Sequence, residues 1–198
     1  MNTAWRRPDE KRRAQKRRIE RPFALGAALG TAAHHGFELA SGLGLVWQPQ
    51  IGLPGAATLW SVQILSWAGL AARGSRRTDP VLAAFSGASL AGVAVHFLLW
   101  PSQPGQCGLP VLIEAEGLSP WQMPSYNAML RAWAVAASGS LVVEVPRGSR
   151  RWAFVGLALL PAFVLSARHH FSWVKEQAVT NPRWWNRGIS LMSTESAR

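Results

Sequence analysis

Histidine and glutamate side chains are grouped in one apolar stretch near the start of the sequence. His34 precedes Glu38 by four residues and His35 precedes it by three, which places all three side chains on one face of a helix. Carboxyl and imidazole groups exchange protons in enzymes, and both also ligate transition metals. The spacing therefore predicts a reactive polar face, with Glu38 as an acid and a histidine as its partner.

Polar and aromatic residues elsewhere in the sequence are candidates for the same site. We expect Arg131 to join the catalytic group of Glu38, His34 and His35, because a guanidinium can hold a phosphate or carboxylate headgroup. Aromatic faces can stabilise a developing cation. The residues expected to contact a substrate are His96, Gln63, Glu114, Glu116, Trp100 and Trp121.

The net charge is confined to three short segments. The chain has 198 residues, with 21 Lys and Arg against 10 Asp and Glu, a formal net charge of +11. The segments cover residues 1–21, 73–79 and 147–151, and the remaining acidic and basic residues cancel. This pattern argues against a uniformly basic globule that binds nucleic acid, and it is typical of a membrane protein with basic cytoplasmic segments.

Five apolar stretches are long enough to cross a bilayer, whose core of about 30 Å needs roughly 20 helical residues. They cover residues 23–46, 56–72, 81–100, 126–145 and 152–171. We expect an all-α, polytopic integral membrane bundle of about five helices over residues 22–174, between a basic leader (1–21) and a C-terminal tail (175–198). Its single cysteine, Cys107, cannot form an internal disulfide.

Loop charges predict the orientation of this bundle. Cytoplasmic segments of membrane proteins are rich in Lys and Arg, so the basic leader places the N-terminus in the cytoplasm. The loops then alternate, because 47–55 is uncharged, 72–80 is basic, 101–125 carries only two acids and 146–151 is basic. A multi-pass protein of the cell membrane follows, with its polar residues in the outer half of the bilayer and an outer loop, 101–125, that covers them.

The buried polar residues leave three functions open. In the first, Glu38 protonates an isoprenoid or other lipid-like substrate, as in terpene cyclisation, because a low-dielectric bundle favours the protonated carboxyl. In the second, the chain is a non-catalytic subunit or assembly factor of a membrane complex, and Glu38 forms a structural ion pair with Arg131. In the third, it is a small transporter or binds a metal ion or haem through His34, His35 and His96. The expected partners are membrane lipid, a lipid-like small molecule and, in the second case, a membrane protein.

Overall fold

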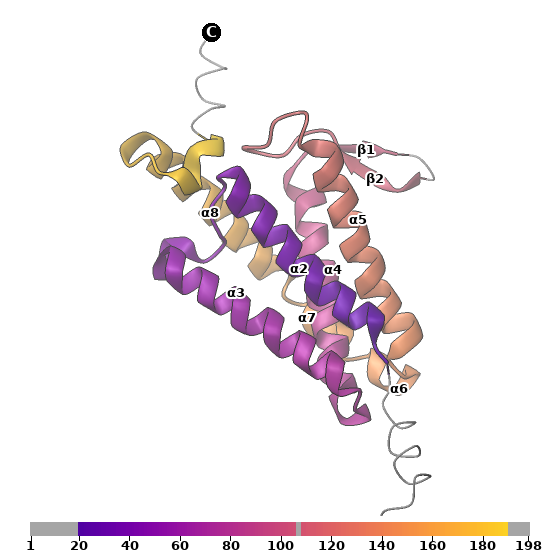
Figure 1. The fold of residues 1–198 in the computed structure, drawn as a ribbon. Coiled ribbons are helices and arrows are strands. Elements are labelled where there is room, and N and C mark those ends of the chain that lie inside the picture. Colours follow the sequence, from indigo (N-terminus) through magenta and orange to yellow (C-terminus); the bar gives the residue numbers. More distant parts are fainter. Residues whose placement is uncertain (1–19, 106–107, 190–198) are drawn as a thin grey trace, which may run out of the picture.

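Long helices form most of the structure, a computed structural model that describes residues 20–105 and 108–189. Figure 1 shows them as a bundle with a small β-hairpin at one end. Cys107, nearly all of the basic leader and the end of the C-terminal tail lie outside the described residues. The long helices are α2 (Pro22–Ser41), α3 (Gln48–Arg73), α4 (Asp79–Leu99), α5 (Met123–Gly139) and α8 (Leu160–Thr180). The all-α prediction is confirmed.

Short elements connect and extend these helices. Strands β1 (Ser102–Pro104) and β2 (Pro110–Leu112) pair antiparallel, with Ser102 opposite Leu112. The π-helical turn η3 (Ser140–Glu144) continues α5. The remaining short elements are η1 (Arg76–Thr78), α6 (Arg147–Arg150), α7 (Ala153–Leu157) and η4 (Trp184–Asn186).

Two segments of the structure are long and apolar enough to span a membrane. They run from Arg76 to Leu99 and from Arg147 to Thr180, and the described residues contain no others. The expected bundle of five spans is therefore not confirmed. In α2 the two histidines and the glutamate lower the mean hydropathy of a helix that is otherwise rich in Ala, Leu and Gly.

Several helix ends differ from the expected spans because of local backbone signals. Helix α2 ends at Ser41 rather than near residue 46. The next residue, Gly42, adopts the left-handed conformation (φ 79°) that closes many helices. Helix α3 begins at Gln48 and has a break at Gly52, whose φ of 71° and ψ of 167° are not helical. Helix α8 continues to Thr180, beyond the apolar stretch that ends near residue 171.

Small residues bring the helices into close contact. Gly30 of α2 lies against α5, where an added Cβ would be 2.7 Å from the Trp133 ring. Gly156 of α7 lies against α4, where a Cβ would overlap the carbonyl oxygen of Ala84. Close backbone approach of this kind is the usual basis of helix association in membranes.

Polar contacts hold the ends of α2, α4 and α5 in position. At the start of α2, the Glu144 carboxylate accepts hydrogen bonds from the backbone N–H groups of Phe23 (2.6 Å) and Ala24 (2.9 Å). Arg21 forms a buried ion pair with Asp79 at the start of α4. These contacts fix how far each of the three helices is shifted along the bundle axis relative to the others. They therefore also fix the relative levels of side chains at the opposite ends of these helices.

Candidate functional site

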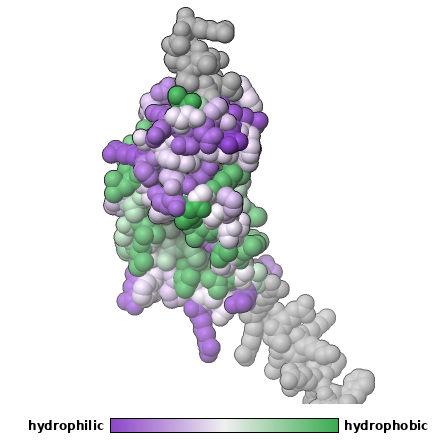
Figure 2. Space-filling model, turned by 90° about the vertical axis from the view of Figure 1, so that its left-hand side faces the viewer, coloured by the Kyte–Doolittle hydropathy of each residue, from purple (hydrophilic) through white to green (hydrophobic). Residues whose placement is uncertain are grey.

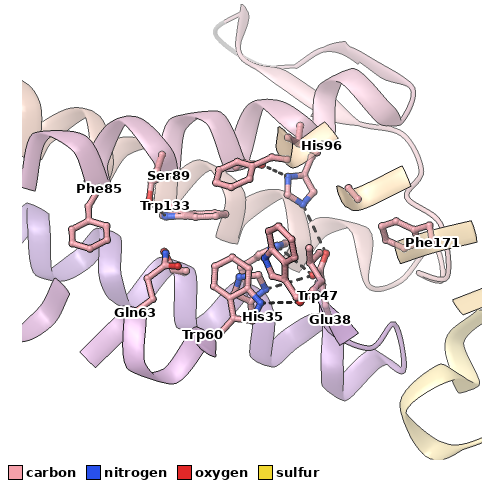
Figure 3. Close-up of a pocket in the computed structure, with 18 of the residues that line it drawn as sticks. His35, Glu38, Trp47, Trp60, Gln63, Phe85, Ser89, His96, Trp133 and Phe171 are labelled. Carbon is pink, nitrogen blue, oxygen red and sulfur yellow. Dashed lines mark hydrogen bonds and ion pairs between the residues drawn. The ribbon is translucent and has the colours of Figure 1, made fainter. Parts of the chain in front are cut away.

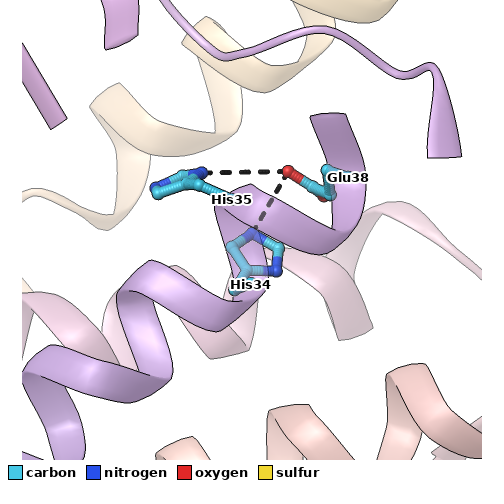
Figure 4. A group of neighbouring side chains, drawn as sticks. All are labelled: His34, His35 and Glu38. Carbon is cyan, nitrogen blue, oxygen red and sulfur yellow. Dashed lines mark ion pairs between the residues drawn. The ribbon is translucent and has the colours of Figure 1, made fainter. Parts of the chain in front are cut away.

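Glu38 lies at the centre of a buried polar cluster made by three helices. The Tyr126 hydroxyl of α5 donates a hydrogen bond of 2.8 Å to Glu38 Oε1. On α2, His34 Nε2 lies 3.3 Å and His35 Nδ1 3.9 Å from Glu38 Oε2 (Figure 4). His96 Nε2 of α4 lies 3.8 Å from Glu38 Oε1. All five side chains belong to residues that are at most 8% exposed, and we call them the Glu38 cluster.

Neighbouring groups orient the three imidazole rings. His96 Nδ1 donates a hydrogen bond of 2.8 Å to the Gly92 carbonyl oxygen, which leaves Nε2 as the ring nitrogen that faces Glu38. The His34 ring stacks on Trp133 with centroids 5.2 Å apart, and the His35 ring packs on Trp60 at 3.9 Å. The rings of the Glu38 cluster are therefore held by aromatic packing as well as by polar contacts.

Four residues of the Glu38 cluster, all except Tyr126, form part of the wall of a cavity between α2, α3, α4, α5 and α8. Its volume is about 80 Å³, counted as the space that the centre of a water molecule can occupy. Apart from the cluster, the lining is mainly apolar and aromatic, and Phe85 lies at the end away from Glu38 (Figure 3). Ser89 accepts a 2.9 Å hydrogen bond from Trp133 Nε1, which satisfies both groups. The cavity therefore presents one ionisable cluster to an otherwise apolar space.

Six of the predicted site residues line this cavity. Local spacing on α2 brings His34, His35 and Glu38 together, as the sequence predicts. Packing of the other helices then adds His96 from α4, Gln63 from α3 and Trp100, which follows α4. The six are Glu38, His34, His35, His96, Gln63 and Trp100.

Arg131 lies away from Glu38, and the expected ion pair between them is absent from the contacts of the described residues. Arg131 follows Tyr126 by five residues, which turns it about 140° around α5 from the side that faces Glu38. It lines a separate pocket together with Leu112 and Asn127. Its Nε atom is buried and has no hydrogen-bond partner within the part of the chain that the structure describes.

The described residues of the loop, 101–105 and 108–125, do not line the cavity, contrary to the expectation that the loop covers the site. Asn127 of α5 holds its hairpin through a pair of hydrogen bonds with the backbone of Leu112, of 2.8 and 3.0 Å. Glu116 instead forms an ion pair of 2.6 Å with Lys175. Glu114 and Trp121 are exposed to solvent.

Sequence reasoning missed several residues of the site. Tyr126 is the single tyrosine of the chain, and its place at the start of an apolar stretch was the available signal. Trp60 and Trp133 face the cavity, although the sequence offered nothing that separates them from the other tryptophans. His170 is also buried, and its Nε2 donates to the Leu43 carbonyl over 2.8 Å.

The arrangement of the Glu38 cluster suits proton transfer or metal binding, since carboxylate and imidazole groups do both. It does not suit a haem held between His34 and His96. Their rings are in edge contact, with centroids 4.8 Å apart and planes at 90°, which leaves no space for a macrocycle. Comparison of the chain with protein-family models, curated proteins and solved structures finds no match.

Proposed function

We propose that this chain is an integral membrane enzyme that acts on an apolar, lipid-like molecule bound in the cavity, with the Glu38 cluster as its reacting group. The observation that carries the proposal is the combination of a buried carboxylate, three imidazoles and an apolar, aromatic cavity beside them. A cluster that only held helices together would need no adjoining cavity. Apolar lining with a few convergent polar groups is typical of small-molecule sites.

The outer surface of the bundle supports its placement in a membrane. Large apolar side chains on several helices are between 59% and 72% exposed, among them Leu29, Leu65, Val135, Phe154 and Leu165. Figure 2 shows a hydrophobic band on one face of the molecule, with hydrophilic residues above and below it. Continuous apolar surface of this kind marks membrane or protein contact. We propose that all five long helices cross the bilayer, with the polar residues of α2 turned inward.

The basic segments support one orientation in that membrane. Helix α6, the start of α2 and the end of α3 lie at the same end of the bundle (Figure 1), and this end carries the arginines of residues 73–77 and 147–151. The positive-inside rule makes it the cytoplasmic end. Glu38 lies near the opposite end of α2, so we infer that in this orientation the Glu38 cluster is in the outer half of the bilayer.

A single labelling experiment tests this orientation. Gly148 lies in α6 and an added Cβ there meets no neighbouring atom, so Gly148→Cys is compatible with the fold. In a Cys107→Ser background, a membrane-impermeant thiol reagent should modify this cysteine only after the cells are permeabilised. Modification in intact cells would contradict the proposed orientation.

The enzyme proposal is tested by the conversion of lipid by purified protein in bilayers. Isoprenoids and extracted membrane lipids are supplied, and products are measured by mass spectrometry. Glu38→Gln should abolish conversion and retain the fold, whereas Glu114→Gln, at an exposed position, should leave it unchanged. Full conversion by Glu38→Gln would overturn the proposal. If the wild-type protein converts none of these lipids and Glu38→Gln only lowers thermal stability, the Glu38 cluster is structural.

A further inference from the structure

We propose that His34, His35, His96 and Glu38 bind a divalent transition metal ion. This inference rests on the proposed function, which it deepens by naming a cofactor for the same site. An ion held there would polarise an oxygen atom of a substrate that binds from the cavity as a fifth ligand. Metal binding itself is measurable without any substrate.

The donor atoms already lie close to the spacing that an ion requires. One donor atom from each of His34, His35 and Glu38 lies within 4.8 Å of the others. Tetrahedral coordination with bonds of about 2.0–2.1 Å places ligand atoms about 3.4 Å apart. The separation of His34 Nε2 from Glu38 Oε2 is 3.3 Å, and those of His35 and His96 from the carboxylate are 3.9 and 3.8 Å. His34 and His35 face Glu38 Oε2 and His96 faces Oε1, so an ion bound by all four residues requires both carboxylate oxygens or a rotation of the Glu38 side chain.

The free ring nitrogens of the cluster also suit a cation. The hydrogen bond of His96 Nδ1 to the Gly92 carbonyl leaves Nε2 as the ring nitrogen that faces Glu38 Oε1. His35 Nδ1 is buried and has no hydrogen-bond partner among the described residues. A metal ion between the two ring nitrogens and the Glu38 carboxylate would be ligated by all three, because imidazole nitrogen and carboxylate oxygen atoms are its preferred ligands.

Groups around the donor atoms have the arrangement that supports metal ligands. Histidine ligands usually donate their other ring N–H to a carbonyl or carboxylate, and ligating carboxylates are hydrogen-bonded in turn. His96 makes the first type of contact with Gly92, and Glu38 accepts the second from Tyr126. A set of imidazoles and one carboxylate, without thiolates, suits Zn²⁺, Fe²⁺ or Co²⁺ better than Mg²⁺ or Ca²⁺.

The experiment titrates Co²⁺ into the full-length protein in detergent after removal of metal with a chelator. Tetrahedral Co²⁺ gives intense visible absorption bands, and we expect them to saturate at one ion per chain and to disappear on addition of Zn²⁺. His35→Gln and His96→Gln should each weaken binding by more than the roughly 10- to 100-fold effect of losing an outer hydrogen-bond partner. His169→Gln is the matched control, because His169 is exposed on α8.

A wild-type protein that takes up no Co²⁺ overturns the proposal, as do cluster variants that bind it as tightly as the control. If either variant fails to fold, the wild-type protein decides, because bound metal must raise its unfolding temperature. Lipid conversion by metal-free protein would overturn the metal site and leave the proposed function standing. Metal binding by a protein that converts no lipid supports the metal site and counts against the enzyme.

Discussion

Replacing Tyr126 by Phe removes one hydroxyl group from the Glu38 cluster and leaves the aromatic ring in place. That hydroxyl donates a 2.8 Å hydrogen bond to Glu38 Oε1, and both residues are almost fully buried, at 1% and 6% exposed. Water therefore cannot easily take the place of the lost donor. The variant isolates one contact, since the ring of Tyr126 keeps its packing against Phe37 and His34.

The expected cost follows from the type of hydrogen bond. A hydrogen bond to a charged group contributes about 1.5–3 kcal/mol to stability, against about 0.5–1.5 kcal/mol for a neutral pair. For a chain of this size, each kcal/mol changes the unfolding temperature by about 2–4 °C. Tyr126→Phe should therefore lower the unfolding temperature by about 3–12 °C.

A double-mutant cycle with Glu38→Gln tests the origin of this effect. In the Glu38→Gln background the hydroxyl faces a neutral amide, so Tyr126→Phe should cost about 1 kcal/mol less than in the wild-type protein. Free energies of unfolding are measured by denaturant titration of the four proteins in one detergent. If the two substitutions add within about 0.5 kcal/mol, as those of independent sites do, the hydroxyl does not act on a charged carboxylate and the reasoning fails.

Three further substitutions, and two control variants at Gly69 and Glu114, test the packing that positions the site, each by thermal unfolding. Gly156→Ala should destabilise by about 1–3 kcal/mol, because its Cβ would overlap α4, whereas Gly69→Ala, with no atom near its Cβ, should stabilise by about 0.5–1 kcal/mol. Glu144→Ala removes the acceptor at the start of α2 and should cost about 0.5–2 kcal/mol, and an equal effect of Glu114→Ala, at an exposed position, would contradict this. Asp79→Ala leaves a buried arginine without its partner and should cost about 3–5 kcal/mol; a loss below about 1 kcal/mol would refute that role.

The part of the site that lies on one helix could be predicted because its geometry is local. His34, His35 and Glu38 share a face of any helix that contains them, whatever packs against it. The position of a residue along the bundle axis could be predicted in part as well. His96 and Glu38 lie at similar positions along their two apolar stretches, which indicated that they lie at a similar level in the bundle. The side of a helix that faces its neighbour could not be predicted. For that reason Arg131 was expected to face Glu38, and Tyr126 was overlooked.

The positions of the loop residues could not be predicted from the sequence either. The sequence predicted an outer loop with two acids, but the hydrogen bonds of Asn127 to the hairpin and the ion pair of Lys175 with Glu116 depend on contacts between distant segments. The described residues of the loop lie outside the cavity lining. Hydropathy and charge carry no information on such contacts, so Glu114, Glu116 and Trp121 were assigned to a site that they do not reach.

The sequence by itself determined the all-α fold, the basic segments and the polar face of α2, because each depends on residues near one another along the chain. Only the tertiary structure decided that His96 and Tyr126 complete the Glu38 cluster and that an apolar cavity adjoins it. The physical reason is that the rotation of each helix about its axis, and its distance from the next helix, decide which side chains meet. A residue's neighbours across a helix interface are set by close contacts such as those of Gly30 and Gly156, and these act between segments far apart in the sequence.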